Sequence, residues 1–425
     1  MSLINGYGYH FLTEPQLIAS YKLTRNELRH MKQLSESFIL SINCGSSSLK
    51  FSLYRALSLK MELQGSIKNI GSENGIFSIC DSKQSVLQDE RACFPNLGAA
   101  VAEIVTWFKN NHHKYRVVAI GHRVIQGGAE HRAPELITSD LLEILSQQIY
   151  LAPNHLPAEI NTIAAFKAAF KDAVQVACFD TLFHRNMPVY AKRYPLPAEF
   201  INKGLAKYGF HGLSYEYIMK KLTVKIPATK RRKIIIAHLG NGASMVAVKN
   251  GMGVDTTMGI SPMGGLVMGT RPGDLDPGAI LFLLKEGNLS YGELDQLLSE
   301  QSGLKALAGT NDVQRLLTDE AKDPKAKDAL TLFCYTAKKF IGALASAMGG
   351  LDILVFTGGI GENSPVIRER ICEDMEFLGI ELHQPSNHHN NEIISSAQGT
   401  VQVRVLATDE EWMIAHHSRN FIDNN

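Results

Sequence analysis

The sequence predicts an α/β protein built from two copies of one unit. The stretches 38–54 and 233–256 share a plan, in which a buried strand is followed by a glycine-rich turn and then by an alternating second strand. When the two are aligned, Gly45 falls opposite Gly240, which is the register expected of a duplication. A chain of 425 residues has room for two or three domains of about 150 residues each.

The first copy begins as a meander and then changes to alternating strands and helices. The segments "LKFSLY", "GSIKNI" and "GIFSIC" keep a short-strand rhythm, which predicts antiparallel pairing. A helical pattern at 96–111 is followed by the apolar strand 116–125, as in a crossover connection.

A third glycine-rich break occurs late in the chain, in "DILVFTGGIGENSPVIRERI". It reads as a buried strand ending at Thr357, a turn, and a helix with Ser364 as N-cap and Pro365 at its first position. Glycine loops between a strand end and a helix start bind phosphates, because their backbone N–H groups are unobstructed. Three such loops predict a nucleotide, although each loop alone is more often an ordinary turn.

Two common nucleotide-binding classes do not fit. The chain has no G-x-x-x-x-G-K-[ST] segment, which disfavours a P-loop protein. "GGIGEN" lacks the full G-x-G-x-x-G spacing and no acidic residue clearly ends a second strand after it, which argues against a Rossmann dehydrogenase.

Composition narrows the partners. Lysine and arginine total 43 against 42 acidic residues, so there is no large positive field for nucleic acid or anionic lipid, and small-molecule partners are expected. No apolar run reaches the roughly 18 residues of a membrane span. The six cysteines are scattered without a C-x-x-C pair, which predicts reduced, mostly buried thiols in a cytoplasmic protein.

Charged residues stand in short polar islands within apolar or glycine-rich sequence. Arg123 follows a buried strand and Arg271 lies in a glycine run, and two such arginines suit a phosphate and a carboxylate; a structural ion pair is the alternative for either alone. Asp180 ends another apolar strand, either as an N-cap or as a carboxylate at a cleft. His211 and His238 are each candidates for the site or for the core.

Seven segments together resemble one family. "INCGSSSLKF", "GHRVIQGG", "FDTLFHRNMP", "YGFHGLSY", "HLGNGAS", "MGTRPGDLDPG" and "FTGGIGENSPVIRE" are similar, in order, to the signature motifs of the acetate kinase family. The resemblance implies two duplicated ribonuclease H-like domains with a nucleotide cleft between them, as in sugar kinases, actin and chaperone ATPases. It also implies a homodimer that reversibly transfers the γ-phosphoryl group of ATP to acetate by direct in-line displacement, with Mg²⁺, giving acetyl phosphate and ADP.

The resemblance also divides the chain. Residues 1–36 differ from the rest, lack an apolar signal-peptide core and are expected to form a helical or partly disordered arm. An N-terminal ribonuclease H-like domain is expected at 37–186. A C-terminal domain for nucleotide binding and dimerisation is expected at 187–411, and a helix at about 412–425 is expected to pack back on the first domain.

The nucleotide is assigned by resemblance to the three glycine loops and to "GTNDVQRL". The implied contacts are Ser46, Ser48, Lys50, His238, Leu239, Gly240, Asn241, Gly242, Asp312, Gln314, Gly358, Gly359, Ile360, Gly361 and Asn363. Gln314 stands where the family has arginine, so adenine binding is expected to be weaker unless Arg315 substitutes. Asn43 and Glu410 are the implied ligands of Mg²⁺, for which Mn²⁺ can substitute, and Asp409 is a second acid beside them.

Catalysis in such a family rests on positive charge rather than on proton transfer. Phosphoryl transfer has a loose transition state, whose equatorial oxygens Arg271 and His211 would stabilise while Arg123 binds the carboxylate. A carboxylate is already ionised at pH 7 and needs no general base, so Asp180 is expected to orient substrate or to reach the metal through water.

The implied acyl pocket departs from the family pattern. Its residues are Arg123, Ile125, Asn154, Phe210 and Pro262. Asn154 replaces an apolar residue, with His155 left in register, and Ile125 is bulkier than the usual small aliphatic. Ile125 therefore favours acetate over propionate, by the 1–3 kcal/mol or so that one methylene is worth. A propionate or short-chain fatty acid kinase, and a non-enzymatic nucleotide-switch ATPase module, remain the alternatives.

Overall fold

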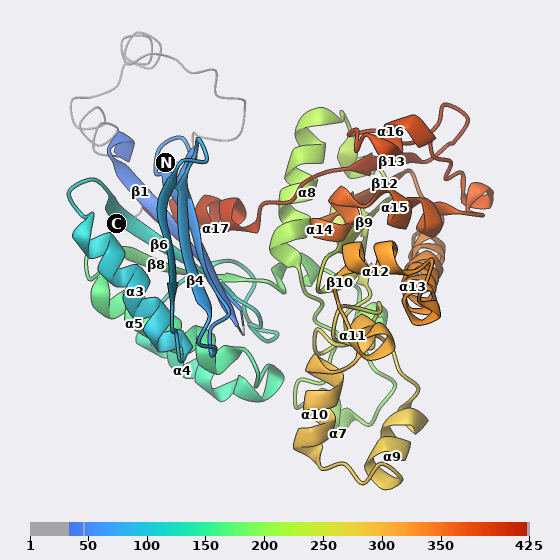
Figure 1. The fold of residues 1–425 in the computed structure, drawn as a ribbon, viewed down its shortest axis with the longest axis horizontal. Helices are drawn as coiled ribbons and strands as arrows, with labels where there is room; N and C mark the ends of the chain where they lie inside the picture. Colours follow the sequence, from blue (N-terminus) through green and yellow to red (C-terminus); the bar gives the residue numbers. More distant parts are fainter. Residues whose placement is uncertain (1–33, 46, 423–425) are drawn as a thin grey trace.

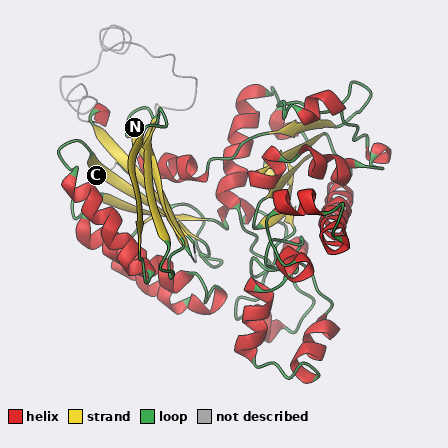
Figure 2. Ribbon diagram, in the orientation of Figure 1, coloured by secondary structure: helices red, strands yellow, loops and turns green. Residues whose placement is uncertain are grey.

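The computed structural model describes residues 34–45 and 47–422. Two α/β units lie next to each other, each built on one sheet (Figure 1, Figure 2). The predicted N-terminal arm lies almost entirely outside the described residues. In the described ranges, no helix combines the length and the apolar character that crossing a bilayer requires.

The first unit contains an eight-stranded sheet in the order β5-β4-β3-β2-β1-β6-β8-β7. Its strands are β1 (Ser37–Cys44), β2 (Ser48–Arg55), β3 (Met61–Lys68), β4 (Gly75–Asp81), β5 (Val86–Ala92), β6 (Arg116–Val124), β7 (Glu135–Leu136) and β8 (Val174–Phe179). The first five strands form the predicted antiparallel meander, whereas β6 and β8 run parallel to β1. The strands are joined by α3 (Leu97–Asn110), α4 (Ser139–Gln147) and α5 (Leu156–Ala169).

The second unit contains a five-stranded sheet in the order β11-β10-β9-β12-β13. Its strands are β9 (Ile234–Leu239), β10 (Ala243–Lys249), β11 (Met252–Thr256), β12 (Ile353–Thr357) and β13 (Gln402–Val405). Its longer helices are α8 (Gly212–Lys225), α9 (Pro277–Lys285), α10 (Tyr291–Glu300), α13 (Pro324–Met348) and α15 (Pro365–Cys372). The shorter ones are α6 (Val189–Lys192), α7 (Ala198–Ile201), α11 (Gly303–Ala308), α12 (Val313–Asp319), α14 (Gly358–Asn363) and α16 (Gln384–His388).

The two sheets share one topology. The order β3-β2-β1-β6-β8 in the first sheet corresponds to β11-β10-β9-β12-β13 in the second, and in both sheets the first pairings are antiparallel and the later ones parallel. Gly45 directly follows β1, as Gly240 directly follows β9. The α/β fold with a duplicated unit, predicted from the sequence, is confirmed.

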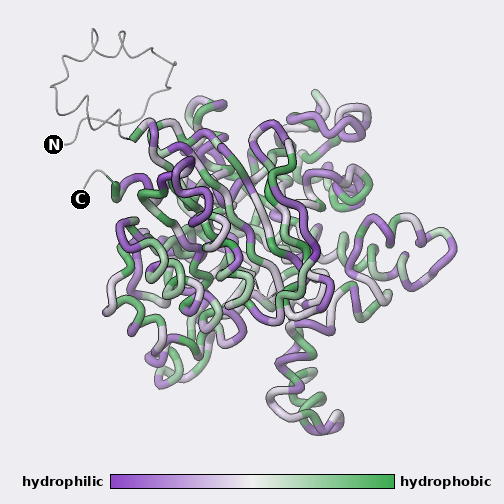
Figure 3. The backbone as a smooth tube through the Cα atoms, turned by 60° about the vertical axis from the view of Figure 1, so that its left-hand side comes forward, coloured by the Kyte–Doolittle hydropathy of each residue, from purple (hydrophilic) through white to green (hydrophobic). Residues whose placement is uncertain are grey.

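Both sheets are covered on both faces. Successive residues of a strand point to opposite sides, so neighbouring residues pack against different helices. In β1, Leu40 packs toward α3 and α5, whereas Ile39 packs with Ala415 of α17 (Glu410–Arg419). In β9, Ile236 packs toward α8 and Ile235 joins the cluster that contains α13. Hydrophobic and hydrophilic stretches accordingly alternate along the backbone (Figure 3).

The chain returns to its first unit at its C-terminal end. Helix α17 packs on β1, β6 and β8, and Met413 and Ile414 lie against Val176 and Cys178 of β8. Asp409 caps this helix by accepting a hydrogen bond from the Trp412 N–H at 2.8 Å. The helix thus brings Glu410 to the edge at which β6 and β8 end.

One predicted turn has a different structure. The segment after β12 was expected to be a glycine-rich turn, but Gly358–Asn363 forms the short helix α14. Ser364 then caps α15 and Pro365 occupies its first position, as the sequence predicts. Gly358 has φ +78°, a conformation open to glycine, and this starts a helix directly at the strand end.

Candidate active site

The site is built where parallel strands of the first sheet end. Arg123 lies near the end of β6 and Asp180 directly follows the neighbouring β8, so both side chains emerge at one edge. Arg123 Nη2 donates to Asp180 Oδ2 at 2.8 Å, and the carboxylate is fully buried. Burial opposes the protonation of Arg123, but Asp180, Glu410 and Glu159 together raise its pKa above the ordinary value.

Asp180 also holds the start of α8 in the second unit. Its Oδ2 accepts from the His211 N–H at 2.9 Å, and its backbone oxygen accepts from the Gly212 N–H at 2.8 Å. A Cβ on Gly212 would lie 2.2 Å from that oxygen, so only glycine permits this approach. His211 has φ +58°, a left-handed conformation that costs a non-glycine residue about 1–3 kcal/mol and that the buried carboxylate stabilises.

His211 and Arg271 converge on the second glycine loop. A Cβ on Gly242 would lie 3.3 Å from His211 Nε2 and 3.7 Å from Arg271 Nη1. His211 stacks on His238 with ring centroids 4.3 Å apart, and Arg271 Nη1 donates to the Pro262 oxygen at 3.1 Å. Burial and the nearby Arg123 lower the pKa of Arg271. Arg271 and His211 therefore face one small space beside Gly242, with Arg123 close enough to act on both, and this arrangement suits an anion.

The predicted acyl pocket is only partly assembled as expected. Ile125, Phe210 and Pro262 are all buried beside these cations. Asn154, in contrast, is exposed, and its Nδ2 donates to Asp295 Oδ2 of α10 at 2.9 Å. The neighbouring His155 is half-buried, and burial, followed by Arg271 and Arg123, lowers its pKa to about 4. The structure thus places His155 near the arginines and leaves Asn154 at the rim.

Sequence reasoning missed a buried acid in this region. Glu159 of α5 is buried, its Oε2 accepts from the Ile125 N–H at 3.0 Å, and its Oε1 has no hydrogen-bond partner among the described residues. Burial raises the pKa of Glu159 to about 7, against the lowering effect of Arg123. Glu159 stands in the first turn of α5, four residues after the N-cap His155, whose backbone oxygen accepts from the Glu159 N–H at 3.1 Å. An acid in the first turn of a helix is common, so the sequence carried no specific signal for it.

Carboxylates from α17 approach the same edge. Asn43 Nδ2 donates to Glu410 Oε2 at 3.3 Å and to Glu411 Oε1 at 3.1 Å, and Arg123 Nη1 donates to Asn43 Oδ1 at 3.5 Å. Burial raises the pKa of Glu410 to about 7. Asp409 is occupied as a helix cap and by the Tyr54 hydroxyl, so Glu410 is the acid that faces the arginine.

A hard cation fits the donors at this edge. No group of three or more His, Cys, Asp or Glu in the described ranges could hold a metal by itself. Mg²⁺ usually takes only one or two carboxylates and completes its shell with phosphate oxygens and water. The Glu410 carboxylate matches that pattern, and a buried carboxylate with a raised pKa gains from a cation. Asn43 turns its amide nitrogen toward Glu410 and its oxygen toward Arg123, so that oxygen would join the same shell only after the amide rotates.

The second and third glycine loops are in contact. The Gly240 N–H donates to the Gly242 oxygen at 3.0 Å, and a Cβ on Gly240 would lie 4.0 Å from the Gly359 nitrogen. The Leu239 side chain is fully buried, so only its backbone is available to a ligand. In the first loop, Ser48 and Lys50 begin β2, while Ser46 lies outside the described residues.

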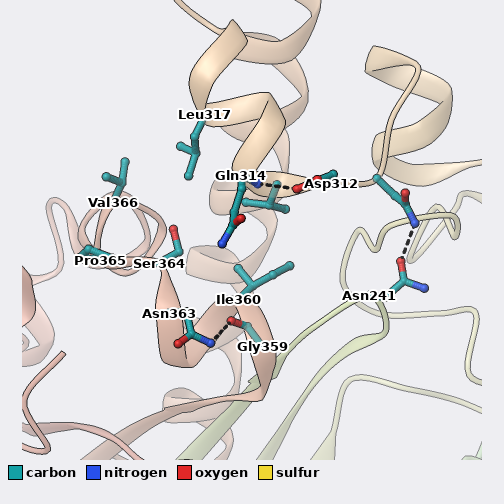
Figure 4. Close-up of a pocket in the computed structure, with 12 residues that line it drawn as sticks. Asn241, Asp312, Gln314, Leu317, Gly359, Ile360, Asn363, Ser364, Pro365 and Val366 are labelled. Carbon is teal, nitrogen blue, oxygen red and sulfur yellow. Dashed lines mark hydrogen bonds between the residues drawn. The ribbon is translucent and has the colours of Figure 1, made fainter. Parts of the chain in front are cut away.

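A pocket of about 510 Å³ opens beside these loops (Figure 4). Six residues predicted to bind nucleotide line it: Asn241, Asp312, Gln314, Gly359, Ile360 and Asn363. The Asp312 carboxylate also caps α12, accepting from the Gln314 N–H at 2.9 Å. Arg315 is exposed and pairs with Asp319, so it does not take the place of an arginine at Gln314. His238, Gly242, Gly358 and Gly361 lie outside this lining.

The Acetokinase family matches residues 38–416. The chain belongs to this family. An acetate kinase of Methylocella silvestris is 40% identical to this chain over 398 residues, which cover 91% of the chain and 98% of that protein. One from Coprothermobacter proteolyticus is 39% identical and covers 90% and 98%.

Solved structures of the family have the same fold. A crystal structure of Porphyromonas gingivalis acetate kinase superposes with a TM-score of 0.82 at 34% identity, covering 91% of this protein and 100% of that chain. A propionate kinase from Francisella tularensis gives a TM-score of 0.85 at 36% identity, covering 90% and 99%. The family and fold class predicted from the motifs are confirmed, and the protein is a kinase.

Proposed function

We propose that this protein is an acetate kinase, which reversibly moves the γ-phosphoryl group of ATP to acetate and so forms acetyl phosphate and ADP. The observation that carries the proposal is that His211 and Arg271 converge next to Gly242, while Asp180 Oδ2 joins Arg123 to the His211 main chain. A non-enzymatic nucleotide switch has no need of two arginines and a histidine beside its phosphate loop.

In this proposal each group has a distinct task. Arg123, fixed by Asp180, binds the acetate carboxylate, and Arg271 and the His211 Nε2 face the oxygens of the transferring phosphoryl group. Both Asp180 Oδ2 hydrogen bonds go to protein groups, so Asp180 orients Arg123 and His211 rather than acting as a base. The carboxylate nucleophile is already ionised and can attack in line.

Mg²⁺, with Mn²⁺ as a substitute, would be held by Glu410 and Asn43 together with the phosphates. When bound, the ion neutralises charge that develops on the phosphate oxygens. Asn43 already contacts both Glu410 and Arg123, so the metal edge and the carboxylate edge are joined through one amide.

The nucleotide would lie across the two glycine loops of the second unit, with its base in the pocket of Figure 4. Gly240 and Gly242 would contact phosphates, and Ile360, Asn363 and Gln314 the adenosine. Ser46, Ser48 and Lys50 would approach the phosphates from the first unit. The boundaries at residues 186 and 411 would then separate two domains that close on the nucleotide.

Acetate is preferred in this proposal because Ile125 and Phe210 are both buried against the arginines. Propionate is the second candidate, favoured by one observation: Asn154 points to Asp295 and does not narrow the pocket. The Francisella tularensis protein described as a propionate kinase, which has the same fold, supports this second candidate.

Assembly as a homodimer is part of the proposal. Helix α9 projects from the second unit at the bottom of Figure 1, and no residue in it is buried. Its Leu281 and Phe282 side chains are 66% and 62% exposed, and such apolar helices are usually covered by a partner. We further place the protein in the cytoplasm, in line with its six free cysteines, four of which are buried.

The test is product trapping. The protein is incubated with Mg²⁺, ATP and acetate, propionate or butyrate, and any acyl phosphate is captured by hydroxylamine. Acetate with the highest kcat/KM supports the proposal. Propionate or butyrate with the highest value keeps the mechanism and replaces the substrate, and no hydroxamate from any acid removes the kinase assignment in favour of the nucleotide switch.

A further inference from the structure

A chain of two buried hydroxyl groups lies behind His211. His211 Nδ1 is 2.7 Å from Ser244 Oγ of β10, and the Ser244 hydroxyl also contacts the hydroxyl of Tyr215 on α8. Tyr215 and Ser244 are both fully buried. The opposite side of the imidazole, at Nε2, faces Gly242 and Arg271.

The direction of these hydrogen bonds follows from counting protons. The only hydrogen bond of the Tyr215 hydroxyl among residues 34–45 and 47–422 is the one with Ser244 Oγ. A fully buried phenol proton left unpaired would cost about 1–3 kcal/mol, so Tyr215 donates to Ser244. Ser244 has one proton of its own, which must then go to His211 Nδ1. The opposite direction would leave the Tyr215 proton without an acceptor.

His211 and Tyr215, the two ends of this row of hydrogen bonds, are both uncharged. Burial, followed by the nearby His238, Arg123 and Arg271, lowers the pKa of His211 well below its ordinary value. Burial raises the pKa of Tyr215 well above its ordinary value. A neutral imidazole whose Nδ1 accepts a hydrogen bond carries its single proton on Nε2.

We propose that Tyr215 and Ser244 are positioning residues that hold His211 as the Nε2–H tautomer, so that it donates a hydrogen bond to the transferring phosphoryl group. The inference rests on the proposed kinase function and deepens it. The donor is neutral, and no proton is transferred in the step. The other tautomer would turn a lone pair toward the phosphoryl oxygens and repel them.

The same hydrogen bonds also explain why His211 tolerates a left-handed backbone conformation. Asp180 fixes the His211 main chain through its N–H, and Ser244 fixes the ring through Nδ1. With both ends held, Nε2 has one direction left, toward the space beside Gly242 and Arg271. Preorganised donors of this kind are worth about 10²–10³ in kcat when one is removed.

The direct test is an ¹⁵N NMR spectrum of the full-length protein labelled at histidine, with the His211 signals assigned through His211→Gln. The proposal predicts a protonated Nε2 and an unprotonated Nδ1 that accepts a hydrogen bond. A His211 with its proton on Nδ1 overturns the proposal without any need for a functional variant.

Variants supply the second readout. Tyr215→Phe keeps the ring and removes one hydroxyl, which frees Ser244 to accept from Nδ1–H. We expect a mixture of both tautomers and a fall in kcat of about tenfold, with KM for ATP little changed. Tyr217→Phe, on the same helix but outside the chain of hydroxyls, is the matched control and should match the wild type in both readouts.

The outcomes of the two tests are separable. A Tyr215→Phe protein with the wild-type His211 spectrum contradicts the role of Tyr215. If the wild-type protein forms no acyl phosphate, the kinase proposal fails, but the NMR spectrum still decides whether the hydroxyls set the tautomer.

Discussion

Replacing Asp180 by alanine would remove the acceptor that Arg123 and His211 share. The carboxylate is fully buried and the Arg123 side chain is 15% exposed, with Nη2 and Oδ2 2.8 Å apart. Breaking a buried pair of this kind costs about 3–5 kcal/mol, because the remaining charge stays in a poorly solvated site. We therefore expect the free energy of unfolding of Asp180→Ala to fall by about this amount and kcat to fall by at least about 10²-fold.

A double-mutant cycle measures the pair itself. Urea unfolding of Asp180→Ala, Arg123→Ala and the double variant should show losses that are not additive, with the double variant about 2 kcal/mol or more better than the sum. The more exposed pair of Arg55 and Glu62, whose side chains are 42% and 28% exposed and whose charged atoms lie 2.7 Å apart, is the matched control and should couple by no more than about 1 kcal/mol. Additive losses at Arg123 and Asp180 would refute the reasoning.

Three further predictions follow from the site. Arg271→Ala should lower kcat by about 10²–10³-fold. Its Tm should change little, because Arg271 has no acidic partner in the described ranges and donates only to the Pro262 oxygen and weakly to the Met268 sulfur. A large loss of Tm would make the role of Arg271 structural. The pKa of Glu410 is raised from 4.5 to about 7, so its contribution to the stability of the metal-free protein is present below about pH 4.5 and is lost as the pH rises through 7. Mg²⁺ affinity should rise over the same pH window, because the carboxylate loses its proton there. Glu410→Gln should flatten both curves, and a pH-independent Mg²⁺ affinity of the wild type would contradict this prediction. Asn154→Leu should leave the kcat/KM ratios for acetate, propionate and butyrate within about twofold of the wild type, because its amide bonds to Asp295, and a clear shift in these ratios would place Asn154 in the pocket after all.

The fold was predictable because its signals are local and repeated. Strand alternation and glycine-rich breaks gave both copies of the unit, and the buried ends of β6 and β8 placed Arg123 and Asp180 at one edge. Where prediction was wrong, the deciding contact was tertiary. The segment after Thr357 has the composition of a turn, but it forms a helix in which Glu362 accepts from the Gly358 N–H at 2.9 Å. The same carboxylate accepts from the Thr408 N–H at 3.2 Å, 46 residues away, and this contact cannot be read from the local sequence.

The charged residues of the candidate site were predicted from the sequence, but the residues that contact and orient the site residues were not. Arginines in glycine-rich sequence indicate an anion, since they have little else to contact. Asn154 could not be placed from the motif alone, because the side it faces depends on Asp295, 141 residues away. The hydroxyls of Tyr215 and Ser244 gave no signal, since a tyrosine on an amphipathic helix and a serine in a buried strand are ordinary residues until their contact is known.

The most direct measurement is the affinity for a mimic of the transition state. Dissociation constants for aluminium fluoride with ADP, Mg²⁺ and acetate would be compared in wild-type protein, Arg271→Ala and His211→Ala, alongside those for ADP alone. The proposed mechanism predicts that the variants bind the planar mimic about 10²-fold more weakly or worse while their ADP affinity changes little. Equal losses for the mimic and for ADP would contradict it, because Arg271 and His211 would then serve nucleotide binding and not the transferring phosphoryl group.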